Sequence, residues 1–353
     1  MEEQQKHKRR PHYSGKYPKK FNEKYKEHDP EKYADTIEKV ISKGSTPAGM
    51  HIPIMVDEIL EVLDIKPGEK GLDCTLGYGG HTSKMLEKLE GQGHLYALDV
   101  DPIEIVKTRA RIAERGFREE LFTAIQTNFR NIDEVAAKYG PFDFLLADLG
   151  VSSMQIDDPS RGFSYKTDGP LDLRLDPEHG ESAAERILKL DADELAGMFI
   201  ENSDEPYAVE IADKIAFYKK RGKSLDTTTA LRELIEGVIV MQKDIRGLSD
   251  KEKKDAVKKS CARVFQALRI DVNSEFEVLY EFLEKLPGVL APGGRAAILT
   301  FHSGEDRLVK KAFKQLTSTG EYESNKDVIR PTPEENFRNP RAHSTKLRWV
   351  RKI

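Results

Sequence analysis

Cysteine and long apolar runs are scarce in this chain of 353 residues. The two cysteines, Cys74 and Cys261, cannot build a disulfide framework or a zinc cluster. No apolar run approaches the roughly 20 residues that a membrane-spanning helix needs, and the first residues lack the apolar core of a signal peptide. We therefore expect a cytoplasmic protein that neither contacts a membrane nor holds a metal.

A strong excess of either charge is also missing, since the formal net charge is −4. The charge is uneven, however: the first 26 residues hold nine Lys and Arg against three acids, and residues 338–353 hold six and no acid. Basic ends on a mildly acidic chain favour contact with a polyanion, although a solvated tail fits the N-terminal stretch equally well. Residues 1–45 carry almost no aliphatic side chains before Ile37, so we expect a basic disordered tail there.

The stretch from Asp73 to His81 is dense in glycine and lies between a predicted strand and a predicted helix. Apolar side chains at helical spacing stand before it at positions 56, 59, 60 and 63 and after it at positions 85, 86 and 89, with Thr82 or Ser83 as the expected helix N-cap. A strand, a glycine loop and a helix in this order bring backbone N–H groups close to an anionic ligand. The sequence therefore predicts a ligand-binding loop here.

The composition of this loop favours S-adenosylmethionine (SAM) over a dinucleotide. A G-x-G-x-x-G fingerprint starts with Gly77 and Gly79 but would need a third glycine where Thr82 stands. Asp73 precedes the loop, where its carboxylate can meet the amino group of SAM while the loop N–H groups meet the SAM carboxylate. A nicotinamide dehydrogenase is therefore the less favoured interpretation, and a capping acid with a plain turn is the structural alternative.

Acidic residues end three of the predicted strands, at Asp73, Asp99 and Asp148. Strands alternate with helices in this region, including a strand at 121–126 and a helix that starts at the N-cap Asp101 and carries a stripe at positions 103, 106, 110 and 113. This alternation predicts a doubly wound, mostly parallel sheet that binds ligands at the carboxyl ends of its strands. Asp99 is then placed to hold a ribose, and Phe129 either covers an adenine or joins the core.

The second half of the chain departs from this alternation. Residues 149–177 are rich in glycine and proline and directly follow the predicted fourth strand, so we expect them to lie over the active site, with a solvated loop as the alternative. Helical spacing without strands follows, which predicts a helical insertion subdomain at 179–261 between two parts of a main domain, 46–178 and 262–353. A turn at 291–294, a strand at 295–301 that brings His302 to the same sheet edge, and a last strand at 346–351 complete the main domain.

Taken together, these segments resemble the RsmH (MraW) family, the SAM-dependent N4-cytosine methyltransferases of bacterial small-subunit (16S) rRNA. The resemblance covers about 51–349 and includes DLGVSS at 148–153 and FQALRI at 265–270, with further matches at 51–55, 73–81, 97–102, 155–164, 168–172, 301–303 and 339–341. It implies a class I SAM-methyltransferase fold, SAM as the cofactor, and small-subunit ribosomal RNA or the 30S subunit as the partner. The oligomeric state stays open, with a dimer as one option.

Several positions depart from the usual pattern of the family. Met154 stands where proline is usual, Gly304 interrupts the usual FHSLEDR motif, and His343 replaces a common arginine. Residues 202–207 differ from the usual Tyr-Gly-Glu-Glu pattern, and the charged segment 241–260 looks inserted. These sites lie mostly toward the RNA, so they concern the choice of nucleotide more than the chemistry. A divergent second copy of the family enzyme would show this pattern.

The resemblance also implies roles for single residues. The expected cofactor contacts are Gly79, Gly80 and His81 in the loop, Asp99 at the ribose, Phe129 near the adenine, and Asp148 and Gln155 near the reacting end, together with Asp73 and Gly77 from the loop itself. Apart from the resemblance, we expect phosphate contacts from Arg161, Arg174, Arg269 and Arg341, while His302 either positions the base or is a structural histidine.

Asp148 is the expected catalytic residue, because a carboxylate can accept a hydrogen bond from cytosine N4 as the methyl group is transferred. It could instead only orient the cofactor, with Asp73 as the dominant acid of the site. Two functional alternatives also stay open: a SAM enzyme that acts on another RNA site, DNA or a protein, and a non-catalytic ribosome-assembly factor that keeps its SAM pocket.

Overall fold

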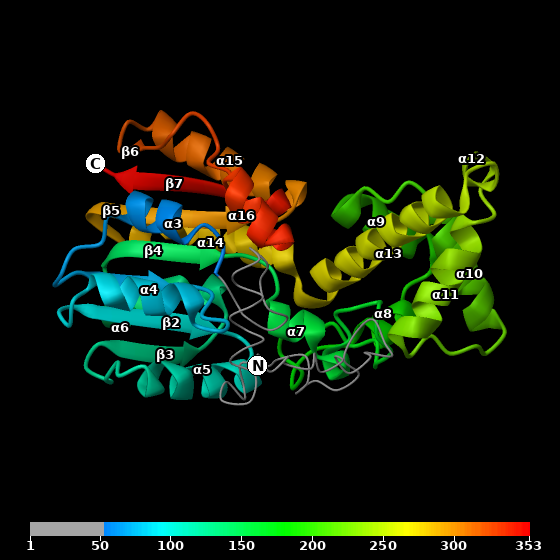
Figure 1. The fold of residues 1–353 in the computed structure, drawn as a ribbon, viewed down its shortest axis with the longest axis horizontal. Coiled ribbons are helices and arrows are strands. Elements are labelled where there is room, and N and C mark those ends of the chain that lie inside the picture. Colours follow the sequence, from blue (N-terminus) through cyan, green and yellow to red (C-terminus); the bar gives the residue numbers. More distant parts are fainter. Residues whose placement is uncertain (1–52) are drawn as a thin grey trace, which may run out of the picture.

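A seven-stranded sheet forms one lobe of the protein in the computed structural model, which describes residues 53–353 (Figure 1). Its strands are β1 (Lys70–Asp73), β2 (His94–Asp99), β3 (Phe122–Gln126), β4 (Phe142–Asp148), β5 (Leu290–Thr300), β6 (Tyr322–Glu323) and β7 (Lys346–Lys352). Their order is β3-β2-β1-β4-β5-β7-β6, parallel from β3 to β5, with β7 antiparallel to both β5 and β6. The expected mostly parallel sheet is confirmed. The tail predicted at 1–45 lies outside the described residues.

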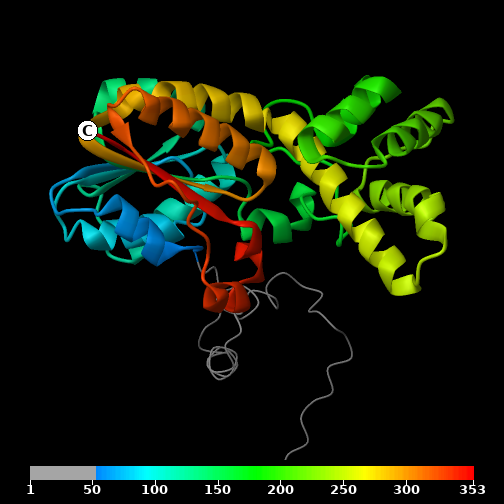
Figure 2. The same cartoon turned by 90° about the horizontal axis from the view of Figure 1, so that it is seen from above.

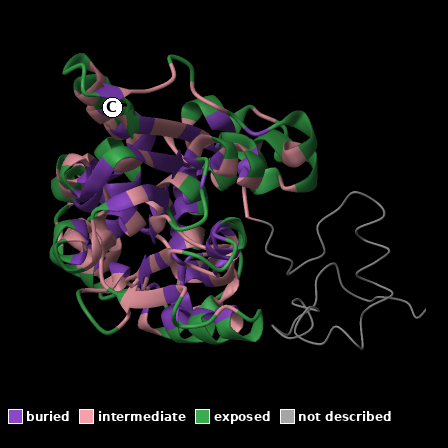
Figure 3. Ribbon diagram, turned by 90° about the vertical axis from the view of Figure 1, so that its left-hand side faces the viewer, coloured by how far each residue is buried: buried purple, intermediate pink, exposed green. Residues whose placement is uncertain are grey.

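Helices cover both faces of this sheet (Figure 2). One face carries α3 (Val56–Leu63), α4 (Gly80–Lys88) and α5 (Pro102–Glu114), and the other carries α6 (Ile132–Tyr139), α14 (Glu275–Val289) and α15 (Ser303–Ser318). Strand β5 alternates between them, with Ala297 and Leu299 in the first layer and Ala296 and Ile298 in the second. Because both faces are covered, the central strands are apolar on both sides, and Figure 3 shows them buried between helices with exposed outer surfaces.

Helices alone form the second lobe (Figure 1). They are α8 (Ala183–Lys189), α9 (Ala192–Ser203), α10 (Ala208–Lys220), α11 (Thr228–Ile239), α12 (Lys243–Arg246) and the first part of α13 (Asp250–Asn273). Their apolar faces enclose a core of their own, in which the predicted stripes with Leu195 and Phe199 on α9 and Ile211 and Ile215 on α10 are buried. That residues 179–261 form a separate domain remains a prediction. The last of these residues lies inside α13, which continues unbroken toward α14.

Two short segments lie between the lobes at the edge of the sheet. Residues 149–177 contain α7 (Ser153–Asp157) and a 3-10 turn (Pro159–Arg161), and are otherwise irregular. Near the C-terminus, α16 (Pro333–Arg338) and a 3-10 helix (Pro340–Ser344) precede β7. Among residues 53–353, no helix is both long and apolar enough to cross a membrane.

The buried face of α5 differs from the predicted one. The expected stripe includes Ile103 and Val106, which are 42% and 65% exposed, whereas Ile105, Thr108 and Ile112 are buried. The hydroxyl of Thr108 donates a hydrogen bond to a backbone oxygen of the glycine loop at 2.6 Å. The prediction was wrong because this contact with the loop, and not the apolar spacing alone, sets the rotation of the helix.

Helix α4 begins earlier than predicted. Its N-cap is Gly79, in the left-handed conformation with a φ of 80°, so that Thr82 and Ser83 lie in the first turn. The hydroxyl of Thr82 donates to the carboxylate of Asp73 at 2.6 Å, and that of Ser83 donates to the carbonyl of Gly79 at 2.7 Å. The N-cap prediction was wrong because glycine takes the left-handed conformation without steric cost, which leaves both hydroxyls to join the loop to the helix.

Strand β5 also differs from its prediction. It begins at Leu290, so the turn expected at 291–294 lies within the strand. Its pairing with β4 shifts register between Phe142 and Phe144, and Gly293 has a φ of 77°. The glycines therefore form an irregularity inside the strand and not a turn before it.

Candidate active site

A cavity of about 540 Å³ opens at the edge of the sheet where β1, β2, β4 and β5 end. This is the edge at which parallel sheets bind ligands, and the volume is in the range of small-molecule sites. The predicted site residues that line it are Gly77, Gly80, His81, Asp99, Phe129, Asp148, Gln155, Arg269, His302 and Arg341. The predicted residues that do not line it are Asp73, Gly79, Arg161 and Arg174.

Asp73 is buried behind the glycine loop. One carboxylate oxygen accepts a hydrogen bond from the backbone N–H of Thr75 at 3.0 Å, and the other accepts from the hydroxyl of Thr82 at 2.6 Å. Burial raises the pKa of Asp73, and these hydrogen bonds oppose the shift. Asp73 therefore joins the end of β1 to the start of α4, and its two oxygens are both engaged within the protein.

Asp99 ends β2 and faces the cavity. One carboxylate oxygen accepts from the backbone N–H of Gly77 at 2.8 Å and the other from that of Asp101 at 2.9 Å. Burial raises the pKa of Asp99 to about 7, although both backbone hydrogen bonds favour the ionised form. A carboxylate has about four lone-pair sites, so Asp99 can accept further hydrogen bonds from a ligand in the cavity.

His81 lies in the first turn of α4 between two acceptors. Its Nε2 is 2.8 Å from the backbone oxygen of Ile54, and its Nδ1 is 3.4 Å from Oδ2 of Asp148. A carbonyl and a carboxylate only accept hydrogen bonds, so this position favours the protonated ring. Burial lowers the pKa of His81, but the contacts with Asp148 and Ile54 outweigh burial and leave this pKa raised. His81 therefore holds one oxygen of Asp148 in place.

Asp148 ends β4 and lines the cavity. Its backbone N–H donates to the hydroxyl oxygen of Thr75 at 2.7 Å, which fixes the main chain at the strand end. While Oδ2 faces His81, Oδ1 is buried and has no hydrogen-bond partner among residues 53–353. A buried acceptor without a partner costs about 1–3 kcal/mol, which the fold accepts here at the wall of a ligand-sized cavity. Asp148 therefore brings to the cavity a carboxylate whose hydrogen-bonding capacity is not fully used within residues 53–353.

Gln155 and Arg161 both bind Asp101, which the sequence predicted only as a helix cap. Asp101 caps α5 by accepting from the backbone at positions 103 and 104, and its other oxygen accepts from Nε2 of Gln155 at 2.9 Å and from Arg161 at 2.7 Å. Arg161 also donates to the backbone oxygens of Arg174 and Leu175 at 3.0 and 2.9 Å. This buried junction fixes the segment after β4 against α5. The pair Asp101-Pro102 signals the cap, but nothing local signals its partners 54 and 60 residues away.

The four predicted phosphate contacts differ in their surroundings. Arg161 is buried with its guanidinium engaged, so it does not reach the surface in this structure. Arg174 pairs with Asp172 through two hydrogen bonds of 2.8 Å. Arg269 lines the cavity but binds both oxygens of Glu275, at 2.7 and 2.9 Å. Arg341, half-exposed and 3.5 Å from Asp157, is the one of the four that most readily meets a ligand.

His302 lies at the start of α15, on the wall of the cavity opposite the glycine loop. It caps the helix, and its Nε2 lies 3.1 Å from Oε1 of Glu305. The second oxygen of Glu305 accepts from the backbone N–H of Phe301 at 2.8 Å. The ring of His302 tilts against that of Phe276, with 5.8 Å between ring centres. Glu275 and Glu305, which hold the two basic side chains of this wall, were missed by the sequence reasoning.

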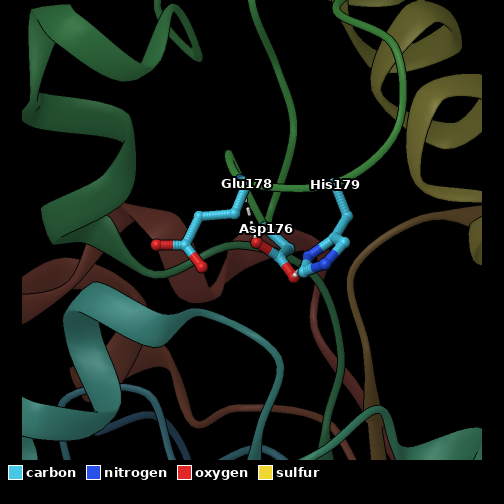
Figure 4. Close-up of side chains that lie close together, drawn as sticks. All are labelled: Asp176, Glu178 and His179. Atoms are coloured by element: carbon cyan, nitrogen blue, oxygen red, sulfur yellow. Dashed lines mark hydrogen bonds and ion pairs between the residues drawn. The ribbon is translucent and has the colours of Figure 1, made fainter.

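Two groups among residues 53–353 bring potential metal ligands together. Asp176, Glu178 and His179 lie in an exposed turn, where Nδ1 of His179 is 2.8 Å from Oδ2 of Asp176 (Figure 4). The other group, Glu275, His302 and Glu305, lies at the cavity, but Arg269 already occupies both oxygens of Glu275. The guanidinium of Arg269 at this position opposes a metal cation, so the group at the cavity does not support a metal centre.

The chain is similar to known proteins along almost its whole length. Residues 48–353 match the MraW methylase family. Two similar proteins are named ribosomal RNA small subunit methyltransferase H 1: that of Lachnoclostridium phytofermentans is 67% identical over 98% of this chain and 93% of its own length, and that of Agathobacter rectalis is 64% identical over 99% of both. Ribosomal RNA small subunit methyltransferase H 2 of Alkaliphilus metalliredigens is 56% identical over 98% of both chains. This chain therefore belongs to the MraW methylase family.

Proposed function

We propose that this chain transfers a methyl group from SAM to the exocyclic N4 of a cytosine in the decoding region of small-subunit rRNA. Membership of a methylase family supports a methyl-transfer enzyme, and relatives that match along nearly their full length are named for small-subunit rRNA. The observation that carries the chemistry is the carboxylate of Asp148, which belongs to a residue lining the cavity and has one oxygen, Oδ1, without a hydrogen-bond partner among residues 53–353.

The cavity residues fit SAM as the methyl donor. Asp99 retains acceptor capacity at the end of β2, which suits the two hydroxyls of a ribose. Phe129 lines the cavity and meets Phe282 edge-on, with 5.3 Å between ring centres, so one face of Phe129 remains for an adenine. Backbone N–H groups at the start of α4 can meet the SAM carboxylate. When bound, SAM supplies a methyl group activated by a positively charged sulfur.

Asp148 would act on the attacking nitrogen. The lone pair of cytosine N4 is delocalised into the ring, and a hydrogen bond from N4–H to the carboxylate of Asp148 would localise it as attack proceeds. His81 holds Oδ2, so the carboxylate keeps a fixed direction toward the reactants. The proton that leaves N4 would pass to this carboxylate as the general base.

The target base must leave its stack to enter this cavity. The segment 149–177, the 3-10 helix at 340–344 and the end of α13 surround the side of the cavity away from the glycine loop. Arg341 is the proposed phosphate contact at the entrance, and His302 positions the base. We reassign Arg161 from the predicted phosphate contact to the junction that holds Gln155 and Asp101. The intact 30S subunit and protein-free rRNA are both candidate substrates.

The deciding experiment compares small-subunit rRNA from cells with and without this protein by mass mapping. Loss of one N4-methyl group from a decoding-region cytosine is the expected result. Relatives carry the numbers H 1 and H 2, so a second copy of the enzyme can mask the loss, and a double deletion resolves that case. Transfer of labelled methyl to rRNA by the purified protein separates the enzyme from a non-catalytic assembly factor. A labelled product other than N4-methylcytosine would contradict the proposal.

A further inference from the structure

Helix α10 has an outer face that takes no part in the cavity. Its inner face is buried in the core of the helical lobe. On the outside, Lys214, Phe217, Tyr218 and Arg221 follow one another at the helical spacing i, i+3, i+4 and i+7, so they form one stripe. Phe217 is 43% exposed within this stripe. A single exposed ring is common on protein surfaces, so the groups around Phe217 decide whether it marks a binding site.

Cations surround the two aromatic rings of the stripe. The guanidinium of Arg221 lies 4.3 Å from the ring centre of Phe217 and Nζ of Lys214 lies 5.2 Å from it, while Nζ of Lys223 lies 4.7 Å from the ring centre of Tyr218. Positions 214–223 hold five Lys and Arg and no acid, and the nearest acids in the sequence stand at 213 and 226. A chain with a net charge of −4 thus concentrates positive charge on one short helical face.

We propose that this basic-aromatic face, residues 214–223, binds a single-stranded or loop segment of the RNA substrate outside the methyl-transfer cavity. The inference rests on the proposed function, because it takes the substrate to be RNA. Lys and Arg neutralise phosphates and release their counterions, and an exposed ring gives an unpaired base a surface on which to stack. The guanidinium of Arg221 lies over one face of the Phe217 ring, so a phosphate contact and a base contact would be adjacent.

Hydrogen bonds connect this face to the segment that leads out of the cavity. Nζ of Lys219 donates to the backbone oxygen of Leu190 at 2.5 Å, which fixes the end of α10 to the start of α9. After the turn, the backbone N–H of Leu171 donates to the oxygen of Asp226 at 2.8 Å, and the hydroxyl of Thr228 donates to the backbone at position 167, also at 2.8 Å. RNA held at 214–223 is therefore in a fixed position relative to residues 149–177, which directly follow Asp148.

The first test removes charge from the face and keeps the fold. Lys220→Gln, Arg221→Gln and Lys223→Gln are combined, and Lys219 is kept because of its bond to Leu190. The matched control, Lys310→Gln with Lys311→Gln and Lys314→Gln, removes the same charge from exposed positions of α15. We expect the KM for the RNA substrate to rise about tenfold or more with kcat unchanged at saturating RNA, and the slope of log Kd against log salt for protein-free rRNA to fall by about two. The control should resemble the wild type, and both variants should bind SAM normally.

The second test addresses stacking. Phe217→Ala should weaken RNA binding by about 5- to 150-fold, which corresponds to the loss of one base–aromatic stack, whereas Phe217→Tyr should bind like the wild type. Equal losses in the charge variant and its control would mean general attraction and would overturn the proposal. An unchanged KM, or Phe217→Ala binding like the wild type, would overturn it as well. So would a loss seen with 30S subunits but not with protein-free rRNA, since the partner would then be a ribosomal protein. If the wild type methylates no RNA, the proposed function fails instead.

Discussion

On one side of the cavity, formed by β1, β2 and the glycine loop, the carboxylates hold the protein's own backbone. Asp99 accepts from two backbone N–H groups, and Asp73 accepts from one N–H and one hydroxyl. On the other side, formed by β4, β5 and α13, Asp148 keeps one oxygen without a partner among residues 53–353, and Arg269 is held by Glu275. The first side is shaped before a ligand arrives, whereas the second retains a group for the reaction itself. The following variants test this contrast, from the largest expected effect to the smallest.

Replacement of the unpartnered acceptor should have the largest effect. Asp148→Asn keeps the shape of the side chain but offers a weaker acceptor and no base, so turnover should fall by about 10²- to 10⁴-fold. SAM affinity should stay near that of the wild type, because Asp148 acts on the nucleophile. Single-turnover transfer of labelled methyl measures the first quantity and calorimetry the second. Near-normal turnover would mean that the carboxylate of Asp148 does not act on the attacking nitrogen.

Arg161 tests whether buried arginines, like the carboxylates near the glycine loop, serve the fold and not the substrate. Arg161→Gln removes one partner of a buried ion pair and leaves Asp101 uncompensated, so the free energy of unfolding should fall by about 3–5 kcal/mol. Arg341→Gln, at a half-exposed position, is the matched control: it should leave stability nearly unchanged and raise the KM for RNA. Urea unfolding and steady-state kinetics separate the two. A stable Arg161→Gln protein with weak RNA binding would restore the original phosphate assignment.

Asp99 should control cofactor affinity and its pH dependence. Asp99→Asn removes charge-assisted hydrogen bonds worth about 1.5–3 kcal/mol, so SAM should bind roughly 10- to 150-fold more weakly while kcat at saturating SAM is retained. Burial raises the pKa of Asp99 to about 7, so the acceptor form of the wild type grows as the pH rises from about 6 to 8. SAM affinity of the wild type should rise over that range, and that of Asp99→Asn should not. Calorimetric titration at several pH values provides the measurement, and parallel profiles would contradict it.

The same shift has a consequence for stability, whose sign follows from proton binding. The folded, ligand-free protein keeps a proton on Asp99 that the unfolded chain releases near pH 4. The contribution of Asp99 to the free energy of unfolding should therefore decrease as the pH rises from about 4 to about 7. Urea unfolding of the wild type and of Asp99→Asn over this pH range measures the contribution, because the difference between their free energies of unfolding excludes other groups.

Two glycines with the same backbone requirement test the shape of the loop. Gly68 and Gly79 have φ values of 90° and 80°, but a Cβ at Gly68 would meet nothing within 4 Å, whereas one at Gly79 would lie 2.8 Å from the side chain of Thr108. Gly68→Ala should cost about 1 kcal/mol of unfolding free energy from backbone strain alone. Gly79→Ala should cost more and should also weaken SAM binding. Equal losses in the two variants would show that the contact with α5 does not matter.

The sequence predicted the features that depend on neighbours along the chain. Acids at strand ends, the Asp101-Pro102 cap and the stripes of α9 and α10 follow from periodicity and local preference, and the structure has these elements where they were expected. The rotation of α5 was missed because Thr108 donates a hydrogen bond to the glycine loop at Gly77, 31 residues earlier in the chain. The burial of Arg161 could not be predicted, because nothing near it in the sequence indicates Asp101, 60 residues earlier, as its partner.

Helix α13 reaches from the helical lobe to the cavity, and a single residue, Ser274, separates it from α14 of the sheet lobe. It runs for 24 residues, or about 36 Å at 1.5 Å per residue, from the helical lobe to Arg269 at the cavity, and Ser274, with a φ of 48°, separates it from α14. Such a rod acts as a lever: a tilt of about 5° at Ser274 displaces the far end by about 3 Å. A change of angle at Ser274 would therefore move the outer helices much farther than the cavity wall.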